Sequence, residues 1–274
     1  SIYGFVGKNG AGKTTLIRLV CGLQFATSGD FTLYGKSSKN ADISTARRRM
    51  GAVVETPSIY LDMTAVDNLK QQYRIIGLPN FDGIPELLKL VGLEDTGKKK
   101  ARNFSLGMRQ RLGIAVALCG SPDFLLLDEP VNGLDPQGII EMRELILKLN
   151  RERGITVLIS SHILDELSRL ATHYGFIDNG RLVKEISAED LEKECRKAAR
   201  VSVSDTKALA VVMDTLGLEY KIIDGKTADI FGEISITTLT ESLKNTYGEL
   251  FSINEHDESL EAYFINLVGG GPNG

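Results

Sequence analysis

The sequence predicts an α/β fold: a parallel sheet covered by helices on both faces, a helical insertion in that domain, and a smaller α+β module later in the chain. Two observations lead to this expectation. Short apolar runs alternate with long stretches of helical periodicity up to about residue 187, and the order of strands and helices changes after that point. The 274 residues, 42% hydrophobic and 25% charged, give enough length for about two domains.

Three apolar runs are too short for helices, and each is followed at once by polar or glycine-rich residues. They cover residues 2–6, 124–127 and 155–159. Their continuous apolar character is typical of parallel strands buried on both faces. Residues 136–153 carry apolar side chains at three- and four-residue spacing before Gly154, which predicts a helix that ends at a glycine.

Two further features complete the first domain, which we expect to span residues 1–187. Residues 64–120 show helical periodicity broken by glycines and a proline, so they predict a helical insertion. Asn179 and Gly180 lie between strand-like runs at 174–177 and 182–186, which indicates a two-residue hairpin turn.

The second domain is expected at residues 188–268. Its pattern reads strand 201–204, helix 206–216, strand 219–223, strand 227–231, helix 236–245 and strand 250–254. This is the order of the split βαβ arrangement of ferredoxin-like domains. A last helix is predicted at 260–267, and the glycine-rich residues 269–274 are expected to form a flexible tail.

Composition excludes several classes of protein. The 32 Lys and Arg against 36 Asp and Glu give a net charge of −4, so no basic field points to nucleic acid as a partner. The three cysteines form no CxxC pair, which argues against a zinc cluster or a disulfide framework and favours a reducing cytosol. Every apolar run is far shorter than the roughly 18–20 residues that span a bilayer, so we expect membrane attachment only through a partner. Because Ser1 stands directly before a strand-like run, we expect a further N-terminal segment to precede it.

The segment GKNGAGKT at residues 7–14 fits the phosphate-loop pattern GxxxxGK[ST], directly after a predicted strand and before a helix. Glycines let the backbone N–H groups turn toward phosphate oxygens, and the helix N-terminus adds partial positive charge. Lys13 would neutralise the β- and γ-phosphates of a nucleotide, and the Thr14 hydroxyl would hold Mg²⁺. The residues of this segment assigned to ATP are Gly7, Asn9, Gly10, Ala11, Gly12, Lys13, Thr14 and Thr15.

Polar residues also follow the other two predicted strands. Asp128 and Glu129 end the run FLLLDEP, where the first carboxylate is expected to bind Mg²⁺ and the second to act as base for the attacking water. His162 follows the strand at 155–159 and is a candidate contact of the γ-phosphate. Because ligands bind at the carboxyl ends of parallel strands, these groups should converge on one crevice.

Residues 1–185 resemble the ATP-binding cassette (ABC) ATPases, whose six motifs occur here in family order. Besides the phosphate loop, FLLLDEP and SSH, these are AVVETP at the position of the Q-loop, FSLGMRQR at that of the signature loop and NGLDP at that of the D-loop. The resemblance implies a P-loop NTPase of the ABC type. It assigns nucleotide contacts to Ser105, Gly107 and Asp135.

The resemblance also implies a mechanism. Two chains, identical or paralogous, would pair head to tail so that Ser105 and Gly107 of one reach the ATP held by the other, and hydrolysis would drive a separate integral membrane permease. The chain would then lie at the cytoplasmic face of the membrane. Glu55 stands where the family usually has Gln and is assigned to Mg²⁺. Glu55 and the segment VVETPSIY around it are similar to the corresponding segment of the bacitracin- and lantibiotic-type exporters. This resemblance implies export of a peptide antibiotic or drug.

Two other functions stay open from the sequence. A soluble ABC ATPase of DNA repair or translation would act on a macromolecule, although such members carry coiled coils, zinc motifs or two cassettes, which this sequence lacks. An ATP-regulated scaffold that does not hydrolyse ATP would leave recognition to the C-terminal module, and the presence of both Asp128 and Glu129 argues against it.

Overall fold

The computed structural model describes residues 1–195, 197–232, 234–257 and 260–268. The chain divides into two compact units, Ser1–Ala188 and Glu189–Gly274. The tail expected at 269–274 lies outside the described residues. No described helix combines the length and the apolar character that crossing a membrane requires.

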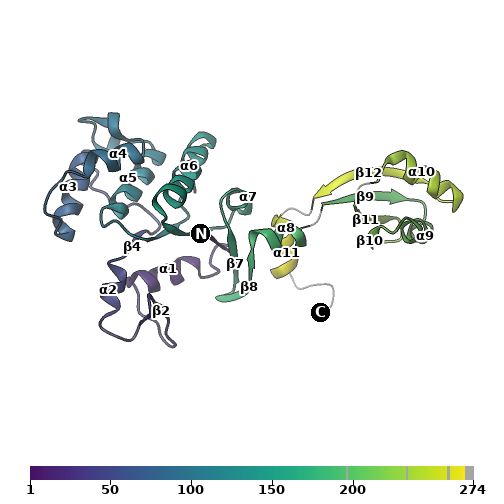
Figure 1. The fold of residues 1–274 in the computed structure, drawn as a ribbon, viewed down its shortest axis with the longest axis horizontal. Coiled ribbons are helices and arrows are strands. Elements are labelled where there is room, and N and C mark those ends of the chain that lie inside the picture. The colour runs from purple at the N-terminus through teal and green to yellow at the C-terminus, as the bar shows by residue number, and fades with distance from the viewer. Residues whose placement is uncertain (196, 233, 258–259, 269–274) are drawn as a thin grey trace. The chain divides into compact units, whose positions relative to one another are not determined.

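The first unit is built on a six-stranded sheet in the order β4-β5-β6-β1-β7-β8 (Figure 1). The five strands from β4 to β7 run parallel, and β8 pairs antiparallel with β7 at the edge. The predicted α/β class with a parallel sheet is therefore confirmed. The strands are β1 (Ile2–Val6), β4 (Met50–Val53), β5 (Phe124–Asp128), β6 (Thr156–Ser161), β7 (His173–Asp178) and β8 (Arg181–Ser187).

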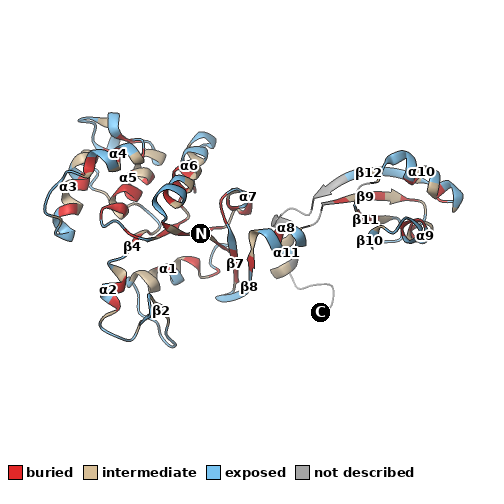
Figure 2. Ribbon diagram, in the orientation of Figure 1, coloured by how far each residue is buried: buried red, intermediate tan, exposed pale blue. Residues whose placement is uncertain are grey.

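The parallel strands of this sheet form because most of their side chains are buried on both faces, whereas the edge strand β8 is largely exposed. In β5, Leu125, Leu126 and Leu127 are all fully buried, a continuous run that only a sheet covered on both sides can hold. Figure 2 shows the buried residues concentrated along the strands and on the inner faces of the helices. Asn179 and Gly180 join β7 to β8 with φ of +46° and +75°, the two left-handed residues that a tight hairpin turn needs.

Helices and two short strands make up the rest of the first unit. Helices α3, α4 and α5 contact one another and form the helical insertion (Figure 1). The elements are α1 (Lys13–Cys21), β2 (Thr32–Leu33), β3 (Lys36–Ser37), α2 (Ile43–Arg47), α3 (Ala65–Ile76), α4 (Ile84–Leu90), α5 (Leu106–Leu118), α6 (Pro136–Arg153) and α7 (Leu164–Ser168), with short 3₁₀ turns at Glu94–Thr96 and Ala101–Asn103.

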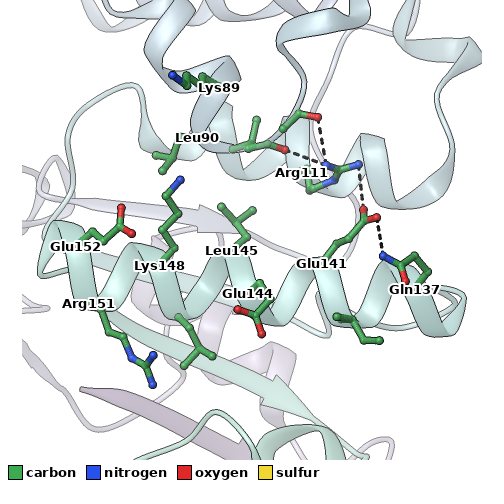
Figure 3. A pocket seen from close by; sticks show the side chains of 14 residues that line it. Lys89, Leu90, Arg111, Gln137, Glu141, Glu144, Leu145, Lys148, Arg151 and Glu152 are labelled. Atoms are coloured by element: carbon green, nitrogen blue, oxygen red, sulfur yellow. Dashed lines mark hydrogen bonds and ion pairs between the residues drawn. The ribbon is translucent and has the colours of Figure 1, made fainter.

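A groove of about 590 Å³ runs between the insertion and α6 (Figure 3). Arg111 of α5 crosses it: its guanidinium donates to the backbone carbonyls of Val91 and Gly92, at distances of 3.1 and 3.2 Å, and pairs with Glu141 of α6 at 3.3 Å. Val91 and Gly92 directly follow the last residue of α4, where backbone carbonyls have no hydrogen-bond partner within the helix. One side chain thus ties two helices of the insertion to the helix that covers the sheet.

The second unit has its own four-stranded antiparallel sheet in the order β10-β11-β9-β12. Helices α9 and α10 bury their apolar sides against the inward residues of this sheet, such as Val201, Ala228 and Ile230. The strand and helix order is that of the split βαβ arrangement. The elements are α8 (Ala188–Glu194), β9 (Lys197–Val203), α9 (Thr206–Leu216), β10 (Glu219–Ile222), β11 (Thr227–Phe231), α10 (Ile236–Asn245), β12 (Leu250–Asp257) and α11 (Leu260–Val268).

Candidate functional site

The loop between β1 and α1 is shaped to receive an anion. Gly10 and Gly12 have φ of +81° and +108°, which side chains on L-residues rarely allow. A Cβ on Gly7 would lie 2.5 Å from the carbonyl oxygen of Ile177, so only glycine permits this close approach. No side chain caps the N-terminus of α1, and its first N–H groups are therefore left to bind an anionic group.

Lys13 is placed at the centre of this loop and is almost fully buried, with 5% of its side chain exposed. Its ammonium donates to the carbonyl of Gly7 at 2.6 Å and to that of Lys8 at 3.3 Å. It also forms an ion pair of 3.2 Å with Oε1 of Glu129. The cation thus lies between the phosphate loop and the residue that follows β5.

Thr14 and Asp128 come from the two neighbouring elements and meet directly. The Thr14 hydroxyl donates to Oδ2 of Asp128 at 2.8 Å. The other oxygen of this buried carboxylate, Oδ1, accepts a hydrogen bond of 2.6 Å from the hydroxyl of Ser160 at the end of β6. Asp128 is therefore fixed from both sides in a single orientation.

Glu129 stands between Lys13 and His162. Oε1 faces Lys13, and Oε2 lies 2.8 Å from Nδ1 of His162. The backbone of Glu129 has a φ of +50°, a left-handed conformation that costs a non-glycine residue about 1–3 kcal/mol. Its N–H donates to both the hydroxyl and the carbonyl of Ser160, at 2.9 and 3.2 Å, and these bonds hold the strained turn.

The structure therefore brings Lys13, Thr14, Asp128, Glu129 and His162 together at the carboxyl ends of β1, β5 and β6. Around them, Gly7 and Ala11 are buried beside the sheet, whereas Asn9, Gly10 and Thr15 are exposed at the mouth of the loop.

The other predicted site residues are engaged elsewhere. The Ser105 hydroxyl caps the N-terminus of α5 by accepting from the N–H of Met108 at 3.2 Å, and Gly107 lies in the first turn of this helix. Asp135 caps α6 in the same way through the N–H of Gly138. Glu55 is half exposed and pairs with Arg18 of α1 at 2.6 Å, so in the described part of the chain its carboxylate is not joined to Thr14 or Asp128.

The donor set at Thr14 and Asp128 fits Mg²⁺. Among the described residues, no group of three or more His, Cys, Asp and Glu side chains could enclose a metal ion. Magnesium does not need such a cage, because it keeps several waters and binds through one or two protein oxygens together with substrate phosphates. A hydroxyl and a carboxylate oxygen 2.8 Å apart beside a phosphate loop supply those protein oxygens.

Two residues near the site were missed by the sequence reasoning. Ser160 contacts both acidic residues, and the sequence carried no specific signal for it, because only the pairing of β5 with β6 sets Ser160 opposite Asp128. Glu166 of α7 has a buried carboxylate oxygen without a hydrogen-bond partner. Burial raises the pKa of this carboxyl, and the charge of nearby Glu129 adds to the rise, while His162 opposes it.

A parallel sheet with a phosphate loop after β1, and with acidic residues after β5, which is separated from β1 by β6 alone, defines a P-loop nucleoside triphosphatase. A family model described as ABC transporter matches residues 1–132. The chain is also 42% identical, over 277 residues, to the bacitracin transport ATP-binding protein BcrA of Bacillus licheniformis, covering 100% of this chain and 90% of that relative. The chain belongs to the family of ABC transporter ATP-binding proteins and is an ATPase.

Two further similarities cover about two thirds of this chain. The lantibiotic transport ATP-binding protein SrtF of Streptococcus pyogenes is 43% identical over 184 residues, which are 67% of this chain and 78% of the relative. The solved structure of cbiO1 from Clostridium perfringens, part of the transporter complex cbiONQ, superposes with a TM-score of 0.62 at 26% identity over 70% of this chain and 80% of that one.

Proposed function

We propose that this ATPase works as one member of a head-to-tail pair in which each ATP lies between two chains. Within one chain, Lys13, Thr14, Asp128, Glu129 and His162 form one group, while Ser105 and Gly107 begin α5 on the insertion. Gly107 neighbours Leu134 instead of the phosphate loop. A signature loop separated from the phosphate-binding group of its own chain is suited to complete the site of a second chain.

The chemistry at the site follows from the contacts. Lys13 and the N–H groups of the phosphate loop would neutralise the terminal phosphates of ATP. Mg²⁺, held by Thr14 and Asp128, would supply charge neutralisation at the phosphate oxygens. Glu129 would accept the proton of the attacking water, and His162, bonded to its second oxygen, would hold the carboxylate in place. This arrangement favours an active hydrolase over an ATP-regulated scaffold.

A mixing experiment tests the shared site. Lys13→Ala removes the phosphate-binding cation, and Ser105→Ala removes the hydroxyl that we assign to the opposite ATP. Each variant alone should have little activity. When the two variants are mixed in equal amounts, half of the random pairs contain one chain of each kind. Each such pair has one intact site out of two, so about one quarter of the wild-type phosphate release should return.

The matched control mixes Lys13→Ala with the double variant Lys13→Ala/Ser105→Ala, in which no pair contains an intact site. Its activity should stay at background. If the first mixture also stays at background although both variants are folded, the site does not lie between chains.

The proposed role of the pair is to power a separate integral membrane permease on the cytoplasmic face of the membrane, and to export a peptide antibiotic of the bacitracin or lantibiotic kind. The support is the similarity to BcrA over the full chain and to SrtF over 67% of it.

Transport is tested by producing this chain with a candidate permease in a bacitracin-sensitive host. We expect the inhibitory concentration of bacitracin to rise with the wild-type chain and not with Glu129→Gln. An equal rise with both chains would separate the resistance from ATP hydrolysis, and no rise with either would contradict the proposed substrate.

A further inference from the structure

We propose that Ser160 is a positioning residue that fixes both acidic residues of the ATPase site through one hydroxyl; this inference rests on the proposed nucleotide site. Ser160 is the second-last residue of β6 and is fully buried, with 0% exposed. It lies opposite Asp128 in the parallel pairing of β5 and β6. Its hydroxyl is therefore placed where the acidic segment leaves the sheet.

The hydroxyl can be oriented in only one way. It has one proton and two lone pairs. Oδ1 of Asp128, 2.6 Å away, takes the proton because a carboxylate can only accept, and the N–H of Glu129 donates to the hydroxyl oxygen at 2.9 Å. One side chain thus donates to the first acidic residue and accepts from the backbone of the second.

The consequence for Asp128 concerns which oxygen faces the metal site. Because Oδ1 accepts from Ser160, the other oxygen, Oδ2, faces the metal site, where it accepts from the Thr14 hydroxyl at 2.8 Å. Without the Ser160 hydroxyl, Oδ1 would be a buried charged oxygen with no partner from this residue, and the carboxylate could rotate away from Thr14. Residues that orient a metal ligand in this way typically change metal affinity or activity by about 10- to 100-fold when removed.

The consequence for Glu129 concerns its backbone. The left-handed turn at Glu129 directs its side chain between Lys13 and His162, and it persists only if its surroundings hold it. The Ser160 hydroxyl makes the shorter of the two bonds to the Glu129 N–H, and only the bond of 3.2 Å to the Ser160 carbonyl would remain after its removal.

The test uses the full chain with two substitutions, Ser160→Ala, which removes the hydroxyl, and Ser160→Cys, which keeps nearly the same volume but donates weakly. Binding of Mn²⁺ to the ADP-saturated protein is followed by the EPR signal of free Mn²⁺, and ADP binding in EDTA is followed by calorimetry. We expect Mn²⁺ affinity to fall about tenfold and kcat about 10- to 100-fold in both variants. ADP affinity in EDTA should be unchanged.

Thr206→Val is the matched control, because it removes another buried hydroxyl, which donates to the carbonyl of Asp224 in the second unit. It should leave Mn²⁺ affinity and kcat unchanged. Wild-type Mn²⁺ affinity and kcat in folded Ser160→Ala or Ser160→Cys would overturn the inference, and so would an equal loss of ADP affinity with and without metal. Failure of the nucleotide site itself would be seen in the wild type, which would neither bind nucleotide nor release phosphate.

Discussion

At the scale of single residues, the site combines groups that a sequence motif identifies with groups that only the sheet pairing reveals. Lys13, Thr14 and Asp128 could be assigned from spacing because phosphate and magnesium chemistry demands those residue types at those positions. Ser160 could not, because serine is common at strand ends. Its role depends on the register that sets it opposite Asp128.

Glu129→Gln should lower ATP hydrolysis by about 10²- to 10⁴-fold, the range for removal of a general base. Glutamine keeps the size of the side chain and can still bond to His162, but it cannot accept the proton from water. Phosphate release measures the rate, and calorimetry should show ATP affinity close to that of the wild type. Hydrolysis at the wild-type rate would show that another group is the base.

Glu166→Gln should stabilise the protein at neutral pH. The pKa of the Glu166 carboxyl is raised in the folded chain, mainly by burial, so ionisation costs more there than in the unfolded chain. Folding is therefore favoured most when this carboxyl is protonated, and the penalty develops as the pH rises above the ordinary carboxyl pKa.

The measurement is the melting temperature of both proteins from pH 4 to pH 7. We expect Glu166→Gln to melt higher than the wild type at pH 7 and to match it near pH 4. A difference of the same size at both ends would assign the effect to something other than ionisation.

At the scale of elements, the segments with a clear apolar pattern were predictable and those without one were not. Helix α6 spans Pro136–Arg153 as expected, because its apolar spacing, its capping Asp135 and its terminal Gly154 agree. Strand β4 was missed, since its four residues have no strong pattern and it is stabilised by pairing with β5. Strand β9 starts at Lys197, earlier than expected, because its pairing with β12 reaches that far.

The groove between the insertion and α6 gives a prediction about Arg111. Arg111→Met keeps an apolar stem of similar length but removes the guanidinium that binds the end of α4 and Glu141. The loss of two hydrogen bonds from a charged group, one of them partly buried, and of the ion pair should destabilise the first unit by about 1.5–3 kcal/mol.

Arg151→Met in the same groove is the control, because Arg151 is exposed and its removal should change stability by less than about 0.5 kcal/mol. Urea unfolding followed by circular dichroism compares the two variants. Equal midpoints for both would show that the Arg111 contacts do not stabilise the insertion.

At the scale of the whole molecule, the two units each have a buried core, so we expect them to unfold separately. Calorimetry should resolve two transitions. A non-hydrolysable ATP analogue with Mg²⁺ should raise only the transition of the first unit, by about 2.7 kcal/mol at a concentration 100 times its Kd. A shift of both transitions would show that the units unfold together.

The turn between β7 and β8 is exposed, but it also contacts the phosphate loop. Exposed two-residue turns are usual places for inserting an epitope or a fluorescent label. Here the N–H of Gly180 donates to the carbonyl of Ala11 at 2.9 Å. The carbonyl of Ile177 in β7 also lies so close to Gly7 that no side chain would fit there. A tag inserted between Asn179 and Gly180 would therefore disturb the phosphate loop, and a site elsewhere on the surface is the better choice for labelling this ATPase.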